Sequence, residues 1–146
     1  MAETELERDP RSSLRKLLYS ASGDVPRSAA TVGSAGAVGM VPRRGGFLSR
    51  TVDPPALPPW LTETDLDLYA GEFASAGFRR GLNWYRNIDR NWELLAPFAG
   101  APVTVPALFM AGDRDLVVAF RGMDQLLPNL KTFVPALQKT VMLPGC

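Results

Sequence analysis

Apolar residues recur at helical spacing near the start of the chain. Three leucines are spaced i, i+3 and i+4, which is typical of one face of an amphipathic helix: Leu14, Leu17 and Leu18. Asp9 followed by Pro10 is typical of an N-cap with proline at the first helical position. Gly23 and Pro26 are expected to end this helix, which lies in the charged, helix-prone residues 5–20.

Two further helices are predicted in the densely patterned sequence that begins at Trp60. Residues 62–65 (TETD) have the form of a capping box, and Gly77 is expected to close the helix that follows. The apolar residues of this helix share one face: Leu66, Tyr69 and Phe73. A second helix is predicted over 81–95, with a stripe at i, i+4 and i+8: Trp84, Ile88 and Trp92. Tyr85 lies beside this stripe and can point toward a different surface.

The last third of the chain predicts a strand, a loop, a helix and a second strand. Residues 105–110 (VPALFM) form a continuous apolar run, which favours a strand buried on both faces. The loop 112–115 (GDRD) follows, then a helix over 118–127 and a strand over 139–143. This order is a βαβ unit, which predicts an α/β fold with a parallel sheet and a right-handed crossover. A two-stranded sheet is marginally stable, so we expect the chain to be only partly folded by itself.

Residues 21–59 predict no regular element. They contain six glycines and six prolines in 39 positions, and both residue types disfavour helices and strands. We interpret this stretch as a long irregular excursion. Its spaced glycines Gly33, Gly36 and Gly39 do not match the G-x-G-x-x-G phosphate motif, so no phosphate site is expected there.

Composition excludes several classes of function. The 146 residues suit one ordinary domain, and 46% hydrophobic with 21% charged residues indicates a globular protein. A net charge of +1 offers no broad footprint for nucleic acid or an anionic membrane. The single cysteine, Cys146, excludes an internal disulfide framework and a Cys-rich zinc site. The absence of histidine removes the commonest general base and the usual metal ligands, unless a histidine is supplied by a further segment.

Neither a membrane span nor a targeting segment is evident in the sequence. No run approaches the ~18 consecutive apolar residues that a span requires. The start, MAETELERDP, is acidic and polar, unlike a secretory signal or a transit peptide. We therefore expect a cytoplasmic protein with no membrane partner.

Two kinds of polar side chain are candidates for a site. Asp113 and Asp115 follow the first predicted strand, and ligands bind parallel sheets beyond the carboxyl ends of strands. The alternative is that one of them caps the next turn or helix. Tyr85 can give a hydrogen bond or a proton to an oxygen that gains negative charge. The alternative is a half-buried core tyrosine beside Trp84 and Trp92, and spacing alone leaves both questions open.

Several stretches of the sequence resemble the soluble epoxide hydrolases of the α/β-hydrolase fold. They are LPPWLTE (57–63), GFR (77–79), GLNWYRN (81–87), NWE (91–93), PALF (106–109) and GDRD (112–115). The resemblance is close over 57–146, weaker over 5–24 and poor over 25–56. It implies a partial α/β-hydrolase fold, in which a helical lid precedes the last βαβ unit of a parallel sheet. The N-terminal core and the final histidine loop of the family have no match.

The resemblance also implies four regions. Residues 1–24 and 57–100 would belong to the lid, and 25–56 would be an irregular Gly/Pro-rich segment. Residues 101–146 would be the C-terminal part of the hydrolase core. The family's nucleophilic aspartate, its oxyanion-hole motif and its first lid tyrosine have no counterpart in this sequence.

Members of that family open an epoxide to a vicinal diol through an aspartyl ester. Two lid tyrosines hold the epoxide oxygen, and a histidine oriented by an acidic residue activates water. The match implies that Tyr85 is one oxygen-binding acid, that Asp115 orients the histidine and that Trp84 binds substrate. Asp113 matches a position without a catalytic role. The resemblance implies an apolar epoxide as substrate and no cofactor, and the chain alone is expected to be inactive.

Two other interpretations stay open on the sequence. A related hydrolase, such as a haloalkane dehalogenase or an esterase, is disfavoured because its chemistry needs no phenol at Tyr85. A non-catalytic protein could use the aromatic side chains of Trp84, Tyr85 and Trp92 to bind an apolar ligand or a partner protein. The identity of the epoxide and the oligomeric state are not determined by the sequence.

Overall fold

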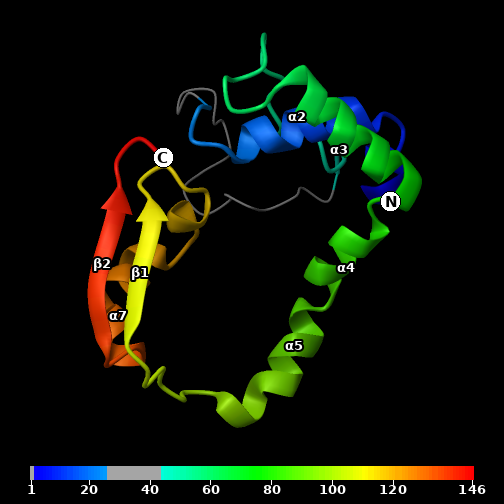
Figure 1. Ribbon diagram of the computed structural model, residues 1–146. Helices are drawn as coiled ribbons and strands as arrows, with labels where there is room; N and C mark the ends of the chain where they lie inside the picture. Colours follow the sequence, from blue (N-terminus) through cyan, green and yellow to red (C-terminus); the bar gives the residue numbers. More distant parts are fainter. Residues whose placement is uncertain (1, 26–43) are drawn as a thin grey trace.

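The computed structural model describes residues 2–25 and 44–146. Figure 1 shows three parts in chain order: a group of N-terminal helices, an arm of short helices and a small sheet. Of the predicted irregular excursion over 21–59, the structure describes 21–25 and 44–59, and the glycines at 33–39 lie outside the described residues. Its described residues 44–59 contain no helix or strand, in agreement with their glycine and proline content.

The N-terminal group, which we call the helical unit, comprises residues 2–25 and 44–78. It contains α1 (Ala2–Leu6), α2 (Pro10–Ala21) and α3 (Glu63–Ala76). The Asp9 carboxylate accepts a hydrogen bond from the Ser12 N–H at 3.0 Å, which confirms the predicted N-cap of α2. The helix ends at Ala21 with Ser22 as its C-cap residue, one position before Gly23, which was expected to end it, and Pro26 lies outside the described residues. The short helix α1 was not predicted.

Helix α3 begins and ends at the predicted residues. The Thr62 hydroxyl accepts a hydrogen bond from the Asp65 N–H, and the Asp65 carboxylate accepts one from the Thr62 N–H, each at 3.1 Å. This reciprocal pair is the predicted capping box. Gly77 follows the helix with φ +71° and ψ 170°, a conformation that is essentially restricted to glycine.

The core of the molecule lies inside the helical unit. Its buried apolar residues are Leu6, Leu14, Leu61, Leu66 and Phe78. Phe73 of α3 stacks on Phe78, with ring centroids 4.5 Å apart. Outside the core, Arg11 of α2 forms ion pairs with Glu63 and Asp67 of α3. Apolar packing and surface charges therefore join α2 to α3.

Side chains from the first two helices hold the described loop that precedes α3. The Glu5 carboxylate of α1 accepts hydrogen bonds from the backbone N–H groups of Phe47 at 2.6 Å and Leu48 at 2.9 Å. The Ser20 hydroxyl of α2 accepts one from the Val52 N–H at 2.7 Å. These bonds satisfy backbone N–H groups of a loop, which have no partner in a helix or a strand.

The arm consists of α4 (Arg79–Arg86) and α5 (Ile88–Leu95). The prediction of one helix over 81–95 is therefore wrong in two respects, since helical structure begins earlier and is interrupted. The interruption lies at Asn87, which ends α4 and precedes α5 with φ −88° and ψ 0°. Asparagine favours such positions because its short polar side chain competes for backbone hydrogen bonds.

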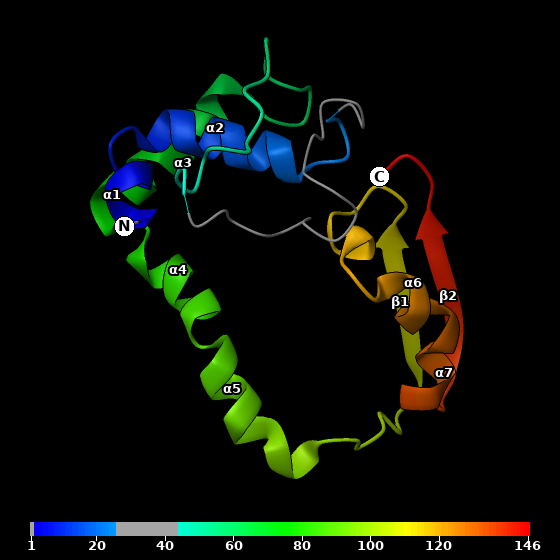
Figure 2. The same cartoon turned by 180° about the vertical axis from the view of Figure 1, so that it is seen from behind.

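The sheet has two strands, β1 (Ala107–Gly112) and β2 (Leu137–Leu143), paired in parallel as predicted. Phe109 lies opposite Thr140 in the register. The expectation that the first strand is buried on both faces is wrong. Leu108 and Met110 are exposed, because the helices between the strands lie over one face only (Figure 2).

Four short helical segments connect the two strands in place of the predicted helix over 118–127. They are the 3₁₀ turn Val117–Ala119, α6 (Met123–Leu126), the 3₁₀ turn Leu127–Asn129 and α7 (Leu130–Phe133). Gly122 separates the first two with φ +89°, outside the helical region. Pro128 lies where a regular helix would need a backbone N–H, so the helix tightens into a 3₁₀ turn.

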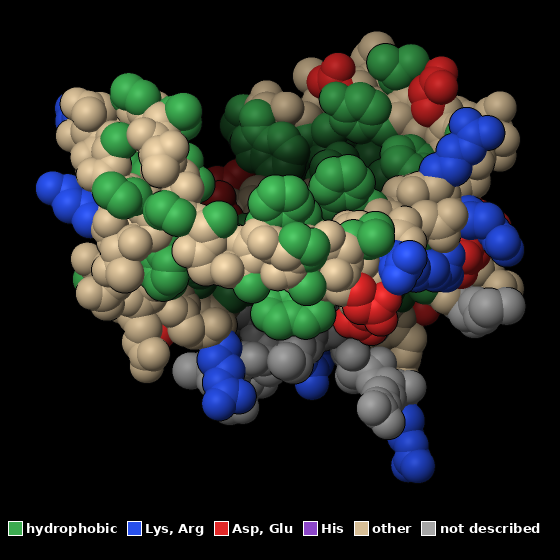
Figure 3. Space-filling view, turned by 90° about the horizontal axis from the view of Figure 1, so that it is seen from below, with side chains coloured by type: hydrophobic (Ala, Val, Ile, Leu, Met, Phe, Trp, Pro, Cys, Tyr) green, Lys and Arg blue, Asp and Glu red, His purple; other side chains and the backbone are tan. Residues whose placement is uncertain are grey.

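Large apolar side chains lie exposed along the arm. They are Trp84, Tyr85, Ile88, Trp92, Leu94 and Leu95. Figure 3 shows hydrophobic side chains gathered around a hollow on the face seen from below. None of the helices in the described residues is both long and apolar enough to span a membrane.

Candidate active site

The loop after β1 brings both predicted aspartates to the carboxyl end of the strand. The Asp113 N–H donates to the Leu143 carbonyl at 3.0 Å, and its carboxylate accepts from the Gly145 N–H at 2.9 Å. The Arg114 N–H donates to the carbonyl of Cys146. Asp113 therefore joins the ends of the two strands, which is a structural role.

Asp115 lies two residues further along the same exposed loop. Its Oδ1 atom accepts a hydrogen bond from the Val117 N–H at 2.7 Å, an Asx turn that leads into the short 3₁₀ turn, whose own N-cap residue is Leu116. This confirms in part the prediction that one of the two aspartates caps the next turn. Among the described residues, its Oδ2 atom takes part in no hydrogen bond to a side chain or backbone group, so one carboxylate oxygen of Asp115 can accept another donor.

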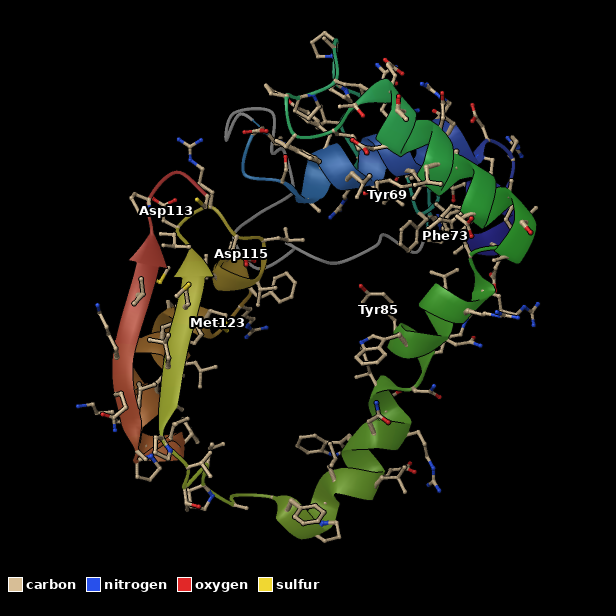
Figure 4. The ribbon with its side chains drawn as sticks, viewed as in Figure 1. Tyr69, Phe73, Tyr85, Asp113, Asp115 and Met123 are labelled. Carbon is tan, nitrogen blue, oxygen red and sulfur yellow. The ribbon has the colours of Figure 1, made fainter. Side chains whose placement is uncertain are left out.

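Tyr85 lies on the last turn of α4, and its side chain is mostly exposed. The residue is 68% exposed, so the alternative of a half-buried core tyrosine is wrong. Neighbouring Trp84 is 79% exposed. Figure 4 shows Tyr85 pointing from the arm toward the side of the molecule where Asp115 lies. No hydrogen bond joins Tyr85 to Asp115, and the two side chains belong to different elements, α4 and the loop that follows β1.

The end of α2 contacts the loop that carries the aspartates. The Arg114 guanidinium donates to the carbonyl of Gly23 at 3.4 Å. A Cβ atom at Gly23 would lie 3.0 Å from the Arg114 Cβ, so a larger residue there would require Arg114 to shift by a few tenths of an ångström. The sequence predicts Gly23 as a helix terminator but carries no signal for this contact across 91 positions.

Two glutamates of the first helix region contact α4, and neither was a candidate on sequence. Glu7 accepts a hydrogen bond from the Phe78 N–H, and Glu3 forms an ion pair with Arg86, the residue after Tyr85. Their spacing of four residues is the only local signal, because it places both on one side of a helix. In the described residues, no cluster of three or more acidic or cysteine side chains is arranged to hold a metal.

Curated relatives of the chain are named epoxide hydrolases, although no protein-family model matches it. It is 41% identical to Epoxide hydrolase A of Mycobacterium tuberculosis over 125 residues, which is 86% of this chain and 37% of that protein. It is 46% identical to Epoxide hydrolase 1 of Siraitia grosvenorii over 102 residues, 68% of this chain and 32% of that protein. The predicted resemblance is thus confirmed.

Solved structures agree with these relatives over almost the whole chain. The epoxide hydrolase from an endophytic Streptomyces gives a TM-score of 0.83 at 37% identity, covering 99% of this chain and 42% of that one. Epoxide hydrolase A of Mycobacterium thermoresistibile gives 0.79 at 38% identity, covering 100% and 42%. Potato epoxide hydrolase I gives 0.74 at 34% identity, covering 99% and 43%.

The chain spans roughly a third to two fifths of the length of these relatives. Its helices and its parallel pair of strands therefore correspond to part of a larger α/β fold, as predicted. The agreement extends to residues outside 57–146, where the sequence resemblance is weaker. The chain belongs to the epoxide hydrolase family of the α/β-hydrolase fold.

Proposed function

We propose that this chain supplies two catalytic side chains, Tyr85 and Asp115, to a site that hydrolyses an apolar epoxide to a vicinal diol. The observation that carries the proposal is the exposure of Tyr85, a large side chain that the fold leaves out of its core. It lies within LNWYRN, the most specific stretch of the resemblance. Asp115 supports the proposal because it lies at the carboxyl end of a parallel strand, where such folds bind ligands.

The proposed role of Tyr85 follows from the chemistry of ring opening. A carboxylate attacks one epoxide carbon, the carbon–oxygen bond breaks, and the ring oxygen gains negative charge. A phenol is protonated at neutral pH, so Tyr85 donates a hydrogen bond to this oxygen and then the proton. Trp84, exposed beside it, offers an apolar wall for the substrate.

The proposed role of Asp115 is to orient a histidine base. Its Oδ2 atom accepts a hydrogen bond from an imidazole N–H, which fixes the tautomer that activates water to hydrolyse the ester. The bond from the Val117 N–H holds the carboxylate in place for this purpose. None of the 146 residues is histidine, so the proposal places the base, like the attacking carboxylate, outside them.

The same proposal assigns regions of the chain. Residues 1–24 and 57–100 form part of a lid over the site, and 101–146 form part of the hydrolase core. The names of the relatives support epoxide chemistry over that of a dehalogenase or an esterase. Taken alone, the 146 residues are expected to form no diol above the level of their own Tyr85→Phe variant.

A chimera tests the proposal. The chain replaces its matching segment in epoxide hydrolase A of Mycobacterium thermoresistibile, where the match covers all 146 residues. We expect diol formation from an aromatic epoxide, and a fall in kcat of roughly 10²–10⁴-fold for Tyr85→Phe. Asp115→Asn is expected to lower kcat by about 10⁴-fold.

Matched controls are available in the same chain. Tyr69→Phe removes another partly exposed hydroxyl, on α3, and Asp124→Asn removes another exposed carboxylate, in α6. Both are expected to keep most of the activity. An active chimera that tolerates Tyr85→Phe as well as it tolerates Tyr69→Phe would contradict the proposal.

The exposed aromatic arm favours one second candidate, a protein that binds an apolar ligand without turning it over. Trp84 and Trp92 provide the surface and also a fluorescence signal. Titration of the chain with an aromatic epoxide and with its carbocyclic isostere separates the two functions. A hydrogen bond from Tyr85 to the ring oxygen gives tighter binding of the epoxide, whereas a purely apolar surface binds both equally.

A further inference from the structure

The helix that carries Tyr85 is attached to the core by its first turn only. Phe78, just before α4, is buried, and Leu82 packs against the core from the first turn of the helix. Beyond Leu82, every residue of α4 is exposed. The position of Tyr85 therefore depends on how α4 is held at each of its two ends.

Glu7 holds the beginning of α4. Its Oε1 atom accepts a hydrogen bond from the Phe78 N–H at 3.1 Å. Phe78 is the N-cap residue of α4 and offers no side-chain cap of its own, so Glu7 satisfies a donor that would otherwise be unpaired at a helix start. A carboxylate there also interacts favourably with the helix dipole.

Glu3 holds the other end of α4, one residue beyond Tyr85. Its Oε1 atom lies 2.7 Å from a guanidinium nitrogen of Arg86, and the Glu3 side chain is only 12% exposed. The other terminal nitrogen of Arg86 donates a hydrogen bond to the side-chain oxygen of Asn83, at 3.1 Å. Arg86 thus connects the last turn of α4 to a nearly buried carboxylate on α1.

Among the described residues, no other ion pair joins α4 to the rest of the protein. The other pairs there lie within the helical unit or within α5, where Arg90 contacts Glu93. The Oε2 atom of Glu3 is buried and has no hydrogen-bond partner among the described residues. Removal of Arg86 would leave the Glu3 carboxylate without the cation that offsets its desolvation, and an unpaired buried charge destabilises the folded state.

We propose that Glu3 is a positioning residue for Tyr85. In this proposal α1 and the residue that follows it, Glu7, act together as a splint that holds the two ends of α4. The proposal rests on the proposed function, because it assumes that the Tyr85 hydroxyl meets the substrate. A helix anchored at its first turn alone can swing, and the displacement grows toward its last turn. Small displacements of a catalytic group lower kcat strongly, by up to about 10²-fold for 1 Å.

Hydrogen exchange measured on the 146-residue chain tests whether the splint exists and requires no catalytic activity. Glu3→Gln and Arg86→Gln are each expected to raise the exchange rate of the amides of 79–87 by roughly two- to fivefold. The double variant is expected to exchange no faster than either single variant, because both remove the same interaction. Glu93→Gln, which breaks the pair inside α5, is expected to leave these amides unchanged. Equal exchange in the parent and in Glu3→Gln would overturn the proposal.

Activity of the chimera then tests the positioning role. Glu3→Gln is expected to lower kcat by roughly tenfold or more with little change in KM, and to have no further effect in a Tyr85→Phe background. Faster exchange in Glu3→Gln with an unchanged kcat would overturn the proposal, leaving Glu3 a merely structural residue. Full activity of Tyr85→Phe would instead overturn the proposed function, and the exchange data would still decide whether the splint exists.

Discussion

Asp113 and Asp115 lie two residues apart in one loop, and their carboxylates accept hydrogen bonds from different parts of the chain. Asp113 is occupied by the Gly145 N–H and ties the strand ends together. The Oδ1 atom of Asp115 accepts from the Val117 N–H, only two positions away. Among the described residues, the Oδ2 atom of neither aspartate takes part in a hydrogen bond, so the two differ in the donor that each accepts. The spacing of the two residues cannot distinguish them, because the difference depends on a backbone donor that lies 32 positions away.

Glu5 shows how a single carboxylate makes stability depend on pH. Hydrogen bonds from the N–H groups of Leu48 and Phe47 lower the pKa of the Glu5 carboxyl below its usual value. A depressed pKa in the folded state stabilises the protein above the usual glutamate pKa, near 4.3. This contribution is lost as the pH falls through the lower pKa of the folded state.

We therefore predict that the free energy of unfolding decreases on acidification below about pH 4.3, in part through Glu5. Urea unfolding followed by circular dichroism at several pH values measures this. Glu5→Gln is expected to lower stability at pH 7 and to flatten the dependence below pH 4.3, whereas Glu72→Gln, at an exposed site on α3, is expected to match the parent. A Glu5→Gln curve parallel to that of the parent would contradict the prediction.

At the level of elements, the glycine inside α3 and the glycine that follows its last residue have opposite requirements. Gly77 ends the helix with φ +71°, and a Cβ there would lie 3.0 Å from the Glu7 carboxylate. Gly71 lies inside the helix, and a Cβ there would meet nothing within 4 Å. Alanine at 77 is therefore strained, while alanine at 71 only lowers the entropy of the unfolded chain.

We predict that Gly77→Ala lowers the free energy of unfolding by about 1–3 kcal/mol. Gly71→Ala is expected to raise it by about 0.5–1 kcal/mol. Urea midpoints of the two variants, measured side by side, check both signs. Equal effects of the two substitutions would show that the backbone conformation at Gly77 does not constrain α3.

Helix starts were predicted correctly where local hydrogen bonds determine them. The Asp9 cap and the Thr62–Asp65 box each involve residues within three positions of one another. The break at Asn87 and the division of the crossover at Gly122 were missed, although both residues are poor helix formers. A hydrophobic stripe outweighed them in the prediction, because periodicity records which side chains are apolar and ignores the backbone between them.

For the molecule as a whole, the buried residues that the structure describes lie in one part of the chain. Among residues 79–146, all of which the structure describes, none is buried. The five core residues belong to the helical unit, and the last of them is Phe78. The arm and the sheet are therefore held by local hydrogen bonds and by partial burial, and they are expected to open more readily than the helical unit.

Limited trypsin digestion of the 146-residue chain tests this difference. We predict that cleavage after Arg80 and Arg90, in the arm, precedes cleavage after Arg11 and Arg15, in α2. A protected fragment that contains α2 should persist while the sheet is degraded. Simultaneous cleavage at both sets of sites would show that the molecule opens as one cooperative unit.

The expectation of a strand buried on both faces failed at this same scale. The run 105–110 is apolar throughout, yet Leu108 and Met110 are exposed. Apolar composition indicates that a strand can be buried, but burial requires another element to cover each face. Only one face of β1 and β2 carries helices here (Figure 2).

Features that depend on residues close together in the chain could be predicted from the sequence: the helix caps, the order of elements that makes the two strands parallel, and the motifs typical of the family. The arrangement of the elements in space determines which side chains are exposed, which backbone N–H each aspartate accepts, and which carboxylates contact α4. Glu3 and Arg86 are 83 positions apart, and no local pattern pairs them. The physical reason is that caps and periodicity follow from the geometry of a few adjacent residues, whereas exposure and ion pairing follow from the positions of separate elements in space.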